Sequence, residues 1–590
     1  MAESDQRAQP MDTEFTPQSQ PLVGQTAHDK GGHSYEVPDR VRLLRFLCLG
    51  VDDRFYRANA HHNTFTRSNV PFIDRLIHQG QGTDTVNLIK NVSLQGRACK
   101  QDTTIYALAI CAKSSDRETK RDAYIALPEV CRTPTHLFQL IKYMKEIADT
   151  SSGWGRSARV GISKWYKSFR SNDPYDKKSS LKLAYLATKY NRRHGWTHRD
   201  AIRMAHVKAP EQDDFRLIIE YLIGKTISDR QGSVSEFLKA VDRTKSSNDI
   251  DEVKKLIAEF HLAREHVPTE FLNNQAVWQL LYRSPMPFTA MLRTLGKMTY
   301  LGLFDSGNAD ADSNITVFEA RLSNVNSGLS KYPKIHPLTL LIALQHYQLG
   351  VACRDRFRWT PNPRIVNALT KAFETQTQIL PSTGKSYLMA VSVGEEMQNK
   401  ICGSSITASK AAAAMILSTV QTEDVEVLMF ANSIDESYTS SIARGDNLDS
   451  VQQKINRVAD SCKNQDGTLS EELCVPFKWA AARQKKFDVI IIFTSSLSSG
   501  GYAHPADMLK MYVEHFASKD YRLIVVGMCD NKYSVASPID MNALDVVGFD
   551  LHVPIVIRDF VSGFQGDDYT TAIHDLSELE EMGNLTIYDQ

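Results

Sequence analysis

The hydrophobic pattern of this chain changes once, near residue 380. From Val41 to about Thr377, apolar residues recur at helical spacing, as in residues 103–114, 135–148 and 337–349. We predict that this region is almost wholly helical, with helix pairs joined by short polar turns. Such pairs favour a solenoid of repeats of about 40 residues each, although the chain carries no strict repeat motif.

Beyond this boundary the apolar runs become short and continuous. Four runs typical of strands buried on both faces lie at residues 386–393, 425–431, 487–494 and 521–528. Helical segments lie between them, at residues 405–420, 448–460 and 505–518. This alternation of strand and helix predicts a parallel, doubly wound α/β sheet.

The two patterns divide the chain into three parts. Residues 1–38 are rich in Gln, Ser, Thr, Asp, Pro and Gly and have almost no apolar clustering. Such a segment cannot bury enough surface to offset the entropy of ordering, so we predict a disordered tail there. An all-α helical-repeat domain is expected at residues 39–380, and an α/β domain at residues 381–590.

The composition indicates the cellular compartment of the protein more clearly than its function. The 590 residues are 42% hydrophobic, and nine cysteines are scattered without CxxC spacing, which fits reduced thiols better than disulfides or a zinc site. The first residues lack the basic start and apolar run of a signal peptide, and no segment reaches the roughly 18 apolar residues of a membrane span. We expect a cytoplasmic protein and leave a nuclear pool open.

Positive charge is concentrated between Ser151 and Lys208. This segment holds fourteen Lys and Arg against three carboxylates, in a chain whose formal net charge is zero. Aromatic residues alternate with the cations, which favours a folded scaffold that presents cations to phosphate groups. From Asp540 to Gln590 there are eleven carboxylates and one Arg. This dipolar layout favours a localised anionic ligand.

One helix of the basic segment is predicted in detail. Thr197 and Asp200 have the spacing of an N-cap pair, so we predict a helix over 198–207. Ile202 and Ala205 are expected to face the core. Three cations spaced four and three apart are expected to share the opposite face: Arg199, Arg203 and His206.

Further cations flank this helix. Lys189 and Arg193 lie in or just beyond the last turn of the preceding predicted helix, and Arg156 and Arg159 are three apart in a second basic cluster at residues 153–166. Each of these cations taken alone has a structural explanation as well, because the carboxyl end of a helix carries partial negative charge, which favours cations. Fourteen together favour phosphate binding. Side chains cannot enter the deep major groove of A-form RNA, so we expect recognition of duplex shape and backbone, with base reading confined to loops or ends.

A series of local motifs resembles the Ro ribonucleoprotein autoantigen family. In chain order the motifs are RFLCLG (45–50), LQGRACKQ (94–101), CRTPTHLF (131–138), GWGR (153–156), HGWTHRDAIRMAH (194–206) and KIHPLTLLIAL (334–344). The resemblance extends from about residue 40 to the end. It implies a TROVE module of HEAT-like helical repeats that forms a ring, closed by a von Willebrand factor A-like domain.

The resemblance implies a ribonucleoprotein component that is not an enzyme. The expected partners are Y-type small non-coding RNAs on the outer basic face, and misfolded RNAs there and through the central hole, in RNA stabilisation or quality control. By matching position, Lys189, Arg193 and His206 fall where the family contacts Y RNA. Local charge alone adds four residues to this predicted RNA-binding site: Arg156, Arg159, Arg199 and Arg203.

The factor A-like domain departs from its family's cation site. The family places a DxSxS loop, a threonine and a further aspartate at the carboxyl ends of the strands, where their oxygens hold a divalent cation. Here Ser392 replaces the first Asp, and the Asp expected after the third predicted strand is missing. We therefore expect no metal and no other cofactor at a degenerate site formed by Ser392, Gly394, Glu396, Thr468 and Ser495. Loop glutamates such as Glu395 remain the alternative oxygen ligands.

Two other classes of function compete with RNA binding. The first is a helical scaffold whose protein partners dock on the factor A-like domain, and this alternative stays open. The second is an enzyme that uses the α/β domain to bind a nucleotide. No GxGxxG or GxxxxGK[ST] motif follows a predicted strand, which argues against the enzyme.

Overall fold

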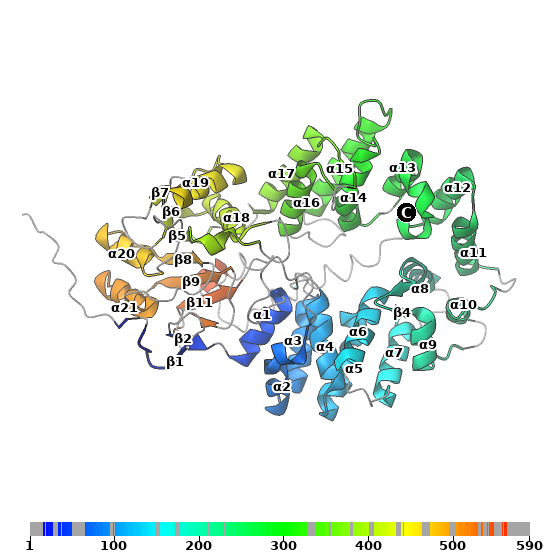
Figure 1. Cartoon of the computed structure of the whole chain (residues 1–590), viewed down its shortest axis with the longest axis horizontal. Coiled ribbons are helices and arrows are strands. Elements are labelled where there is room, and N and C mark those ends of the chain that lie inside the picture. Colours follow the sequence, from blue (N-terminus) through cyan, green and yellow to red (C-terminus); the bar gives the residue numbers. More distant parts are fainter. Residues whose placement is uncertain are drawn as a thin grey trace, which may run out of the picture.

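The structure, a computed structural model, arranges the elements of the chain as a ring (Figure 1). An arc of helices runs from α1 to α17, and an α/β domain joins the two ends of the arc. The structure describes residues 16–17, 19–27, 33–36, 38–49, 65–94, 98, 101–147, 154–170, 177–210, 213–227, 231–284, 286–326, 337–352, 356–377, 382–400, 406–431, 438–440, 442–462, 473–494, 503–517, 520–528, 533–534, 540, 542–547, 557–558 and 560–562.

Helices of the arc form two limbs, which lie below and above the centre of Figure 1. The first limb contains α1 (Asp39–Leu49), α2 (Pro71–His78), α3 (Gly82–Leu94), α4 (Gln101–Lys113), α5 (Arg117–Val130), α6 (Pro134–Ile147), α7 (Arg156–Lys167), α8 (Lys177–Lys189) and α9 (His198–Ala205). The turn between the limbs contains α10 (Asp214–Leu222), α11 (Ser233–Ser246) and α12 (Ile250–Phe260). The second limb contains α13 (Gln275–Arg283), α14 (Phe288–Tyr300), α15 (Ala311–Asn326), α16 (Pro337–Leu349) and α17 (Pro363–Thr377).

Successive helices pack as the two layers of a solenoid. Along the first limb α3 packs on α5, α5 on α7 and α7 on α9, while α4 packs on α6. On the second limb α14 packs on α16, and α15 on α17. In both limbs these helices contact the next but one, which is the arrangement of stacked helical repeats. The all-α helical-repeat ring predicted from the periodicity and the family resemblance is confirmed.

The α/β domain is doubly wound around a six-stranded sheet in the order β11-β9-β8-β5-β6-β7. Its strands are β5 (Ser386–Ser392), β6 (Asp424–Phe430), β7 (Tyr438–Ser440), β8 (Val489–Thr494), β9 (Arg522–Gly527) and β11 (Ala543–Val547). Its helices are α18 (Ala408–Val420), α19 (Leu448–Ser461), α20 (Val475–Ala482) and α21 (Pro505–His515). All strand pairs are parallel except that of β6 with the edge strand β7.

Alternate residues of the central strand β5 enter different cores. Met389 and Val391 belong to the core that contains α18 and α19, whereas Leu388 and Ala390 belong to the core that contains α20 and α21. This is the period of two that a strand covered on both faces requires. The continuous apolar run of the sequence therefore predicted the layering correctly.

The predicted disordered tail is wrong for part of residues 1–38. β1 (Gln25–Ala27) pairs with β2 (His33–Glu36), and β2 pairs with β10 (Tyr533–Ser534) of the α/β domain. In addition, the backbone N–H of His504 donates to the carbonyl of Thr16 at 3.2 Å. The partner of β2 in the α/β domain, β10, lies some 500 residues away in sequence. The composition of residues 1–38 therefore could not predict this pairing.

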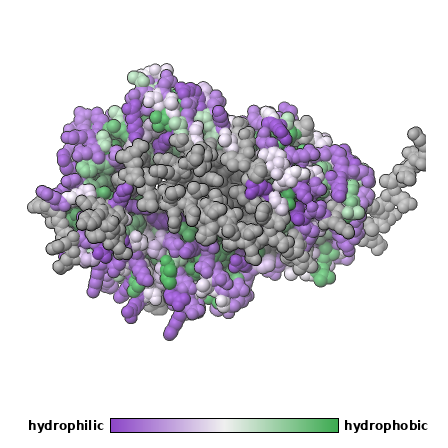
Figure 2. Space-filling model, turned by 180° about the vertical axis from the view of Figure 1, so that it is seen from behind, coloured by the Kyte–Doolittle hydropathy of each residue, from purple (hydrophilic) through white to green (hydrophobic). Residues whose placement is uncertain are grey.

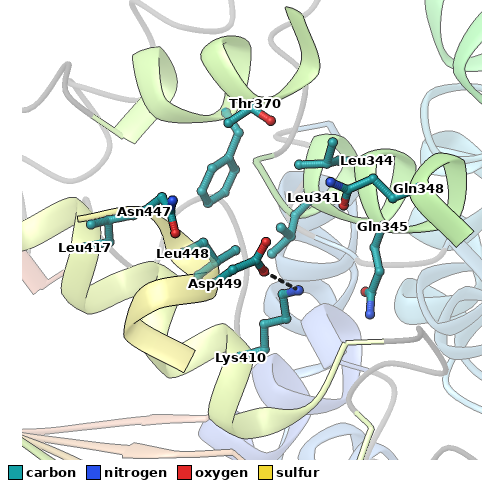
Figure 3. Close-up of a pocket in the computed structure, with 11 residues that line it drawn as sticks. Leu341, Leu344, Gln345, Gln348, Thr370, Lys410, Leu417, Asn447, Leu448 and Asp449 are labelled. Carbon is teal, nitrogen blue, oxygen red and sulfur yellow. Dashed lines mark hydrogen bonds and ion pairs between the residues drawn. The ribbon is translucent and has the colours of Figure 1, made fainter. Parts of the chain in front are cut away.

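At the other end of the arc, the helices and the α/β domain share one apolar core. Buried residues of α16 and α17 belong to the same cluster as those of α18 and α19. A cavity of about 180 Å³ lies within this junction, lined by Leu341, Leu344, Phe373, Leu417 and Leu448 among others (Figure 3). The ion pair of Lys410 with Asp449, at 3.4 Å, borders it. Because this core is continuous across residue 380, the packing marks no domain boundary there. The boundary at residue 380 therefore stays a prediction.

The described surface is mostly hydrophilic. On the face shown in Figure 2, hydrophilic side chains predominate and hydrophobic ones stand in small, separate groups. Within the described ranges, no helix combines the length and the apolar character that crossing a bilayer needs.

Packing between α5 and α7 depends on a glycine, which gives a first test. A Cβ atom on Gly161 of α7 would overlap the ring of Tyr124 on α5. We expect Gly161→Ala to destabilise the protein by roughly 1–3 kcal/mol, because the ring has to shift, and to lower the midpoint of urea unfolding. Gly307→Ala is the control, since Gly307 lies in a turn and a Cβ there meets nothing within 4 Å. Equal midpoints for the two variants would contradict this account of the packing.

A buried histidine joins α7 and α9. His198 is 2% exposed, its Nδ1 lies 2.8 Å from the hydroxyl oxygen of Tyr166, and its ring centre lies 4.9 Å from that of Phe138. Burial disfavours the charged imidazolium and lowers the pKa of His198 to about 3, from an ordinary value of 6.5. Below pH 6.5 the unfolded chain therefore binds more protons at this position than the folded protein does.

The sign of this difference gives a second test. As the pH falls below 6.5, His198 should reduce the free energy of unfolding by about 1.4 kcal/mol per pH unit. His198→Asn should be less stable than the native protein at pH 7.5, but its urea midpoint should fall less steeply between pH 6.5 and 4.5. His261→Asn, which changes an exposed histidine, should keep the native slope. A native slope for His198→Asn would show that His198 does not cause the acid sensitivity.

Candidate nucleic-acid interface

A tight hairpin between α8 and α9 presents two arginines. β3 (Arg192–Arg193) pairs with β4 (Trp196–Thr197), and the two residues between them, His194 and Gly195, have φ angles of 52° and 80°. Positive φ at both positions is the requirement of a type I′ turn, which matches the twist of a two-stranded hairpin. Arg192 and Arg193 are both exposed. The turn therefore fixes the backbone from which these two guanidinium groups extend.

Aromatic packing anchors this hairpin to the scaffold. The half-buried Trp196 meets Trp154, just before α7, edge to face with ring centres 5.8 Å apart. Trp165 of α7 is fully buried and donates its indole N–H to the carbonyl of Cys131. These tryptophans anchor the hairpin and α7 to the scaffold. Trp165, being fully buried, offers no open face to a ligand.

The helix that follows the hairpin, α9, begins at His198, as predicted. The Thr197 hydroxyl accepts from the backbone N–H of Asp200 at 3.2 Å, and the Asp200 carboxylate accepts from the backbone N–H of Thr197 at 3.1 Å, so the capping box is complete. Ile202 and Ala205 are buried, as predicted.

Three predicted cations lie on or just beyond this helix. Arg199 and Arg203 of α9 are exposed. His206 is exposed too, but it is the C-cap of α9 with a φ of 50°, so the helix ends at Ala205 and not near residue 207. The prediction that His206 continues the helical row of the two arginines is therefore wrong. It leaves the helix in the left-handed conformation.

Lys189 and Arg193 meet at one tyrosine. The Nζ atom of Lys189, the last residue of α8, lies 5.2 Å from the ring centre of Tyr190, and the guanidinium carbon of Arg193 lies 5.8 Å from the same centre. The ring thus holds two predicted site residues together, although they come from different elements. Sequence reasoning left Tyr190 and Arg192 out of the predicted site, although Tyr190 links two of its members and Arg192 is exposed beside Arg193. The signal available in the sequence was their position between Lys189 and Arg193.

The remaining cations lie where a helix disfavours them. Arg156 and Arg159 occupy the first turn of α7, which has no acidic residue, and both are exposed. The first turn of α8 likewise lacks an acidic residue. Because the amino end of a helix already carries partial positive charge, these arginines raise a local potential that an anion would relieve.

We define the basic face as the seven residues Arg156, Arg159, Lys189, Arg193, Arg199, Arg203 and His206. In the part of the chain that the structure describes, no carboxylate lies within 4.0 Å of their cationic nitrogens. Some cations of other helices are paired, for example Arg75 with Asp39 at 2.6 Å and Arg216 with Glu220 at 3.1 Å. Even Arg170, close in sequence, is bound to Asp213 at 2.7 Å. The basic face thus keeps its charge available for an external anion.

The described part of the predicted degenerate cation site lies at the end of β5 and just after it. At the end of β5 the Ser392 hydroxyl is buried and accepts from the backbone N–H of Gly394 at 3.0 Å, so the loop itself uses this oxygen. Glu395 and Glu396 lie on the short 3₁₀ helix that follows. No three acidic, His or Cys side chains converge among the described residues. Two predicted members of the degenerate site, Thr468 and Ser495, lie outside those residues.

Comparisons with known proteins agree with this architecture. Residues 26–352 match the TROVE domain, and residues 386–561 match the Ro60 vWA domain. The chain is 30% identical to proteins named RNA-binding protein RO60 from Caenorhabditis elegans and Deinococcus radiodurans, covering 92% and 91% of this chain and 90% and 96% of those proteins.

A solved structure extends the similarity to three dimensions. The crystal structure of the Deinococcus radiodurans Ro (RSR) protein matches with a TM-score of 0.67 at 27% identity, covering 89% of this chain and 99% of that one. The similarity to these proteins therefore extends over both domains and over nearly the whole length of each relative. The chain therefore belongs to the Ro60 family, whose members join a TROVE domain to a von Willebrand factor A-like domain.

Proposed function

We propose that this protein binds structured RNA through the basic face. The observation that carries the proposal is that seven cationic side chains, six of them exposed and Lys189 half-buried, come from α7, α8, β3 and α9 with its C-cap and have no carboxylate partner among the described residues. The RO60 relatives are themselves named RNA-binding proteins. A polyanion that neutralises these side chains releases its condensed counterions, and this release drives association.

The form of the basic face favours a duplex backbone over a base sequence. The cations extend from helices and a tight hairpin, and no such surface fits the narrow major groove of A-form RNA. Spaced cations on a rigid scaffold can instead follow phosphates along a helix. We expect bases to be read only where a loop or an end leaves them unpaired.

The more specific ligands follow from the family. We propose Y-type small non-coding RNA as a ligand of the basic face, with Lys189, Arg193 and His206 as its principal contacts. Misfolded structured RNAs are proposed to bind the same face and to pass an unpaired end through the ring. The proposed role is RNA stabilisation or quality control in the cytoplasm, and it requires no catalytic step.

The α/β domain is proposed to close the ring without a divalent cation. It holds both ends of the arc, through the β2–β10 pairing and through the shared core of α17 and α18. Neither contact involves the loop after β5 where the family places its metal. Protein partners at this domain remain compatible with that role.

The basic face is tested by charge removal. The triple variant Lys189→Gln, Arg193→Gln, His206→Gln should weaken binding of a duplex-containing RNA hairpin. It should also flatten the log–log dependence of affinity on salt by about 0.7 to 0.9 for each phosphate that is no longer neutralised. Filter binding at several salt concentrations measures both effects.

A matched control removes the same residue types elsewhere. Lys225→Gln, Arg121→Gln, His261→Gln changes two exposed cations that already have carboxylate partners and one exposed histidine that, like His206, caps a helix in the left-handed conformation. This variant should bind as the native protein does. If both triples bind alike, the basic face is not the RNA site.

Metal independence is tested by calorimetry. Titration of the native protein with Mg²⁺ should show no saturable heat, because the described loop offers too few carboxylates to balance the cation. Glu396→Gln should give the same trace. Saturable binding that disappears in Glu396→Gln would show that the loop glutamates have rebuilt the site.

A further inference from the structure

A second group of aromatic and cationic side chains lies on the other limb of the ring. Tyr300, at the end of α14, is 50% exposed, and its ring centre lies 5.0 Å from that of Phe357. The Nζ atom of Lys297 lies 4.9 Å from the first ring centre and 5.1 Å from the second. We call these three residues the α14 platform. None of them belongs to the predicted RNA-binding site.

Phe357 is held in place by a buried tryptophan. Its ring lies 5.9 Å from that of Trp359, which is 8% exposed and donates its indole N–H to the carbonyl of Tyr347 at 3.0 Å. The indole reaches this position because α14 has a glycine opposite it: a Cβ on Gly296 would lie 2.6 Å from the Trp359 ring. The platform is therefore preorganised by buried packing, although its upper ring is open to solvent.

Lys297 is fixed beside the two rings. Its ammonium donates to the side-chain oxygen of Asn273 at 2.9 Å, and partial burial lowers its pKa from the ordinary value. Arg293, one turn before Lys297 on the same stripe of α14, and Arg356, next to Phe357, are both exposed. Neither has an ion pair with a carboxylate within the described residues. Ring faces flanked by such cations are the usual means of binding single-stranded nucleic acid.

We propose that the α14 platform stacks an unpaired base of single-stranded RNA on Tyr300, while Lys297 and the neighbouring arginines contact the adjoining phosphates. This proposal rests on the proposed RNA binding and adds a second, chemically different contact. α7 and α9 lie on one limb of the ring and α14 on the other (Figure 1). An RNA whose duplex lies on the basic face therefore reaches the platform only with a free single-stranded end.

Two RNA probes separate the platform from the basic face. The first is a blunt RNA hairpin, and the second is the same hairpin with an unpaired 3′ uridine tail, both labelled for fluorescence anisotropy. Tyr300→Ala should weaken binding of the tailed hairpin roughly 5- to 100-fold, the range expected for loss of one stacked base. It should leave binding of the blunt hairpin unchanged. Tyr300→Phe keeps the ring and should bind the tailed hairpin as the native protein does.

Tyr438→Ala is the matched control, since Tyr438 is a 42% exposed tyrosine on β7 of the α/β domain. It should bind both probes as the native protein does. The platform is overturned if Tyr300→Ala binds the tailed hairpin as tightly as the native protein, or if Tyr438→Ala weakens binding as much. Should the native protein bind neither probe, the proposed RNA binding itself fails. If it binds both probes equally tightly, only the platform fails.

Discussion

Uncompensated positive charge, held rigid by packing, is the constraint on which the functional surface depends. Arg156 and Arg159 begin a helix whose backbone already repels them, and Lys189 and Arg193 share one tyrosine ring. Such repulsion costs stability, so buried groups beneath must oppose it: Trp165 under α7, and His198 with Tyr166 between α7 and α9. An anionic ligand removes the repulsion, and part of its binding free energy comes from this relief.

Closure of the ring fixes how far apart the two limbs lie. The arc is covalently continuous with the α/β domain at α17, but at α1 its end is held by β2, which pairs with β10, and by the His504 contact to Thr16. A solenoid open at one end would bend freely between repeats, because each repeat touches only its neighbours. The pairing of β2 with β10, some 500 residues apart in sequence, therefore fixes the distance between the two ends of a fold in which each repeat contacts only its neighbours.

How much the sequence predicted depended on the range of the interactions. Local ones were predictable: the Thr197 cap, the buried faces of α9 and the alternation of β5 follow from residues a few positions apart. Partners distant in sequence were not, as with β2 and β10. The meeting of Lys189 and Arg193 at Tyr190 is also local, but helical periodicity did not predict it, because α8 ends at Lys189 and Arg193 lies on the strand β3.

The two proposed contacts respond differently to salt, and this difference determines which RNA remains bound as salt rises. Affinity of the basic face for any duplex falls as salt rises, because the release of counterions becomes less favourable. Stacking of a base on Tyr300 depends mainly on the contact between ring faces, which ions screen little. The stacked base multiplies the affinity of an RNA with a free end by a factor that salt changes little, so the preference for such an RNA persists at every ionic strength. As ionic strength approaches that of the cell, the electrostatic contribution shrinks. The stacked base then keeps an RNA with an exposed end bound at salt concentrations that release a fully paired one.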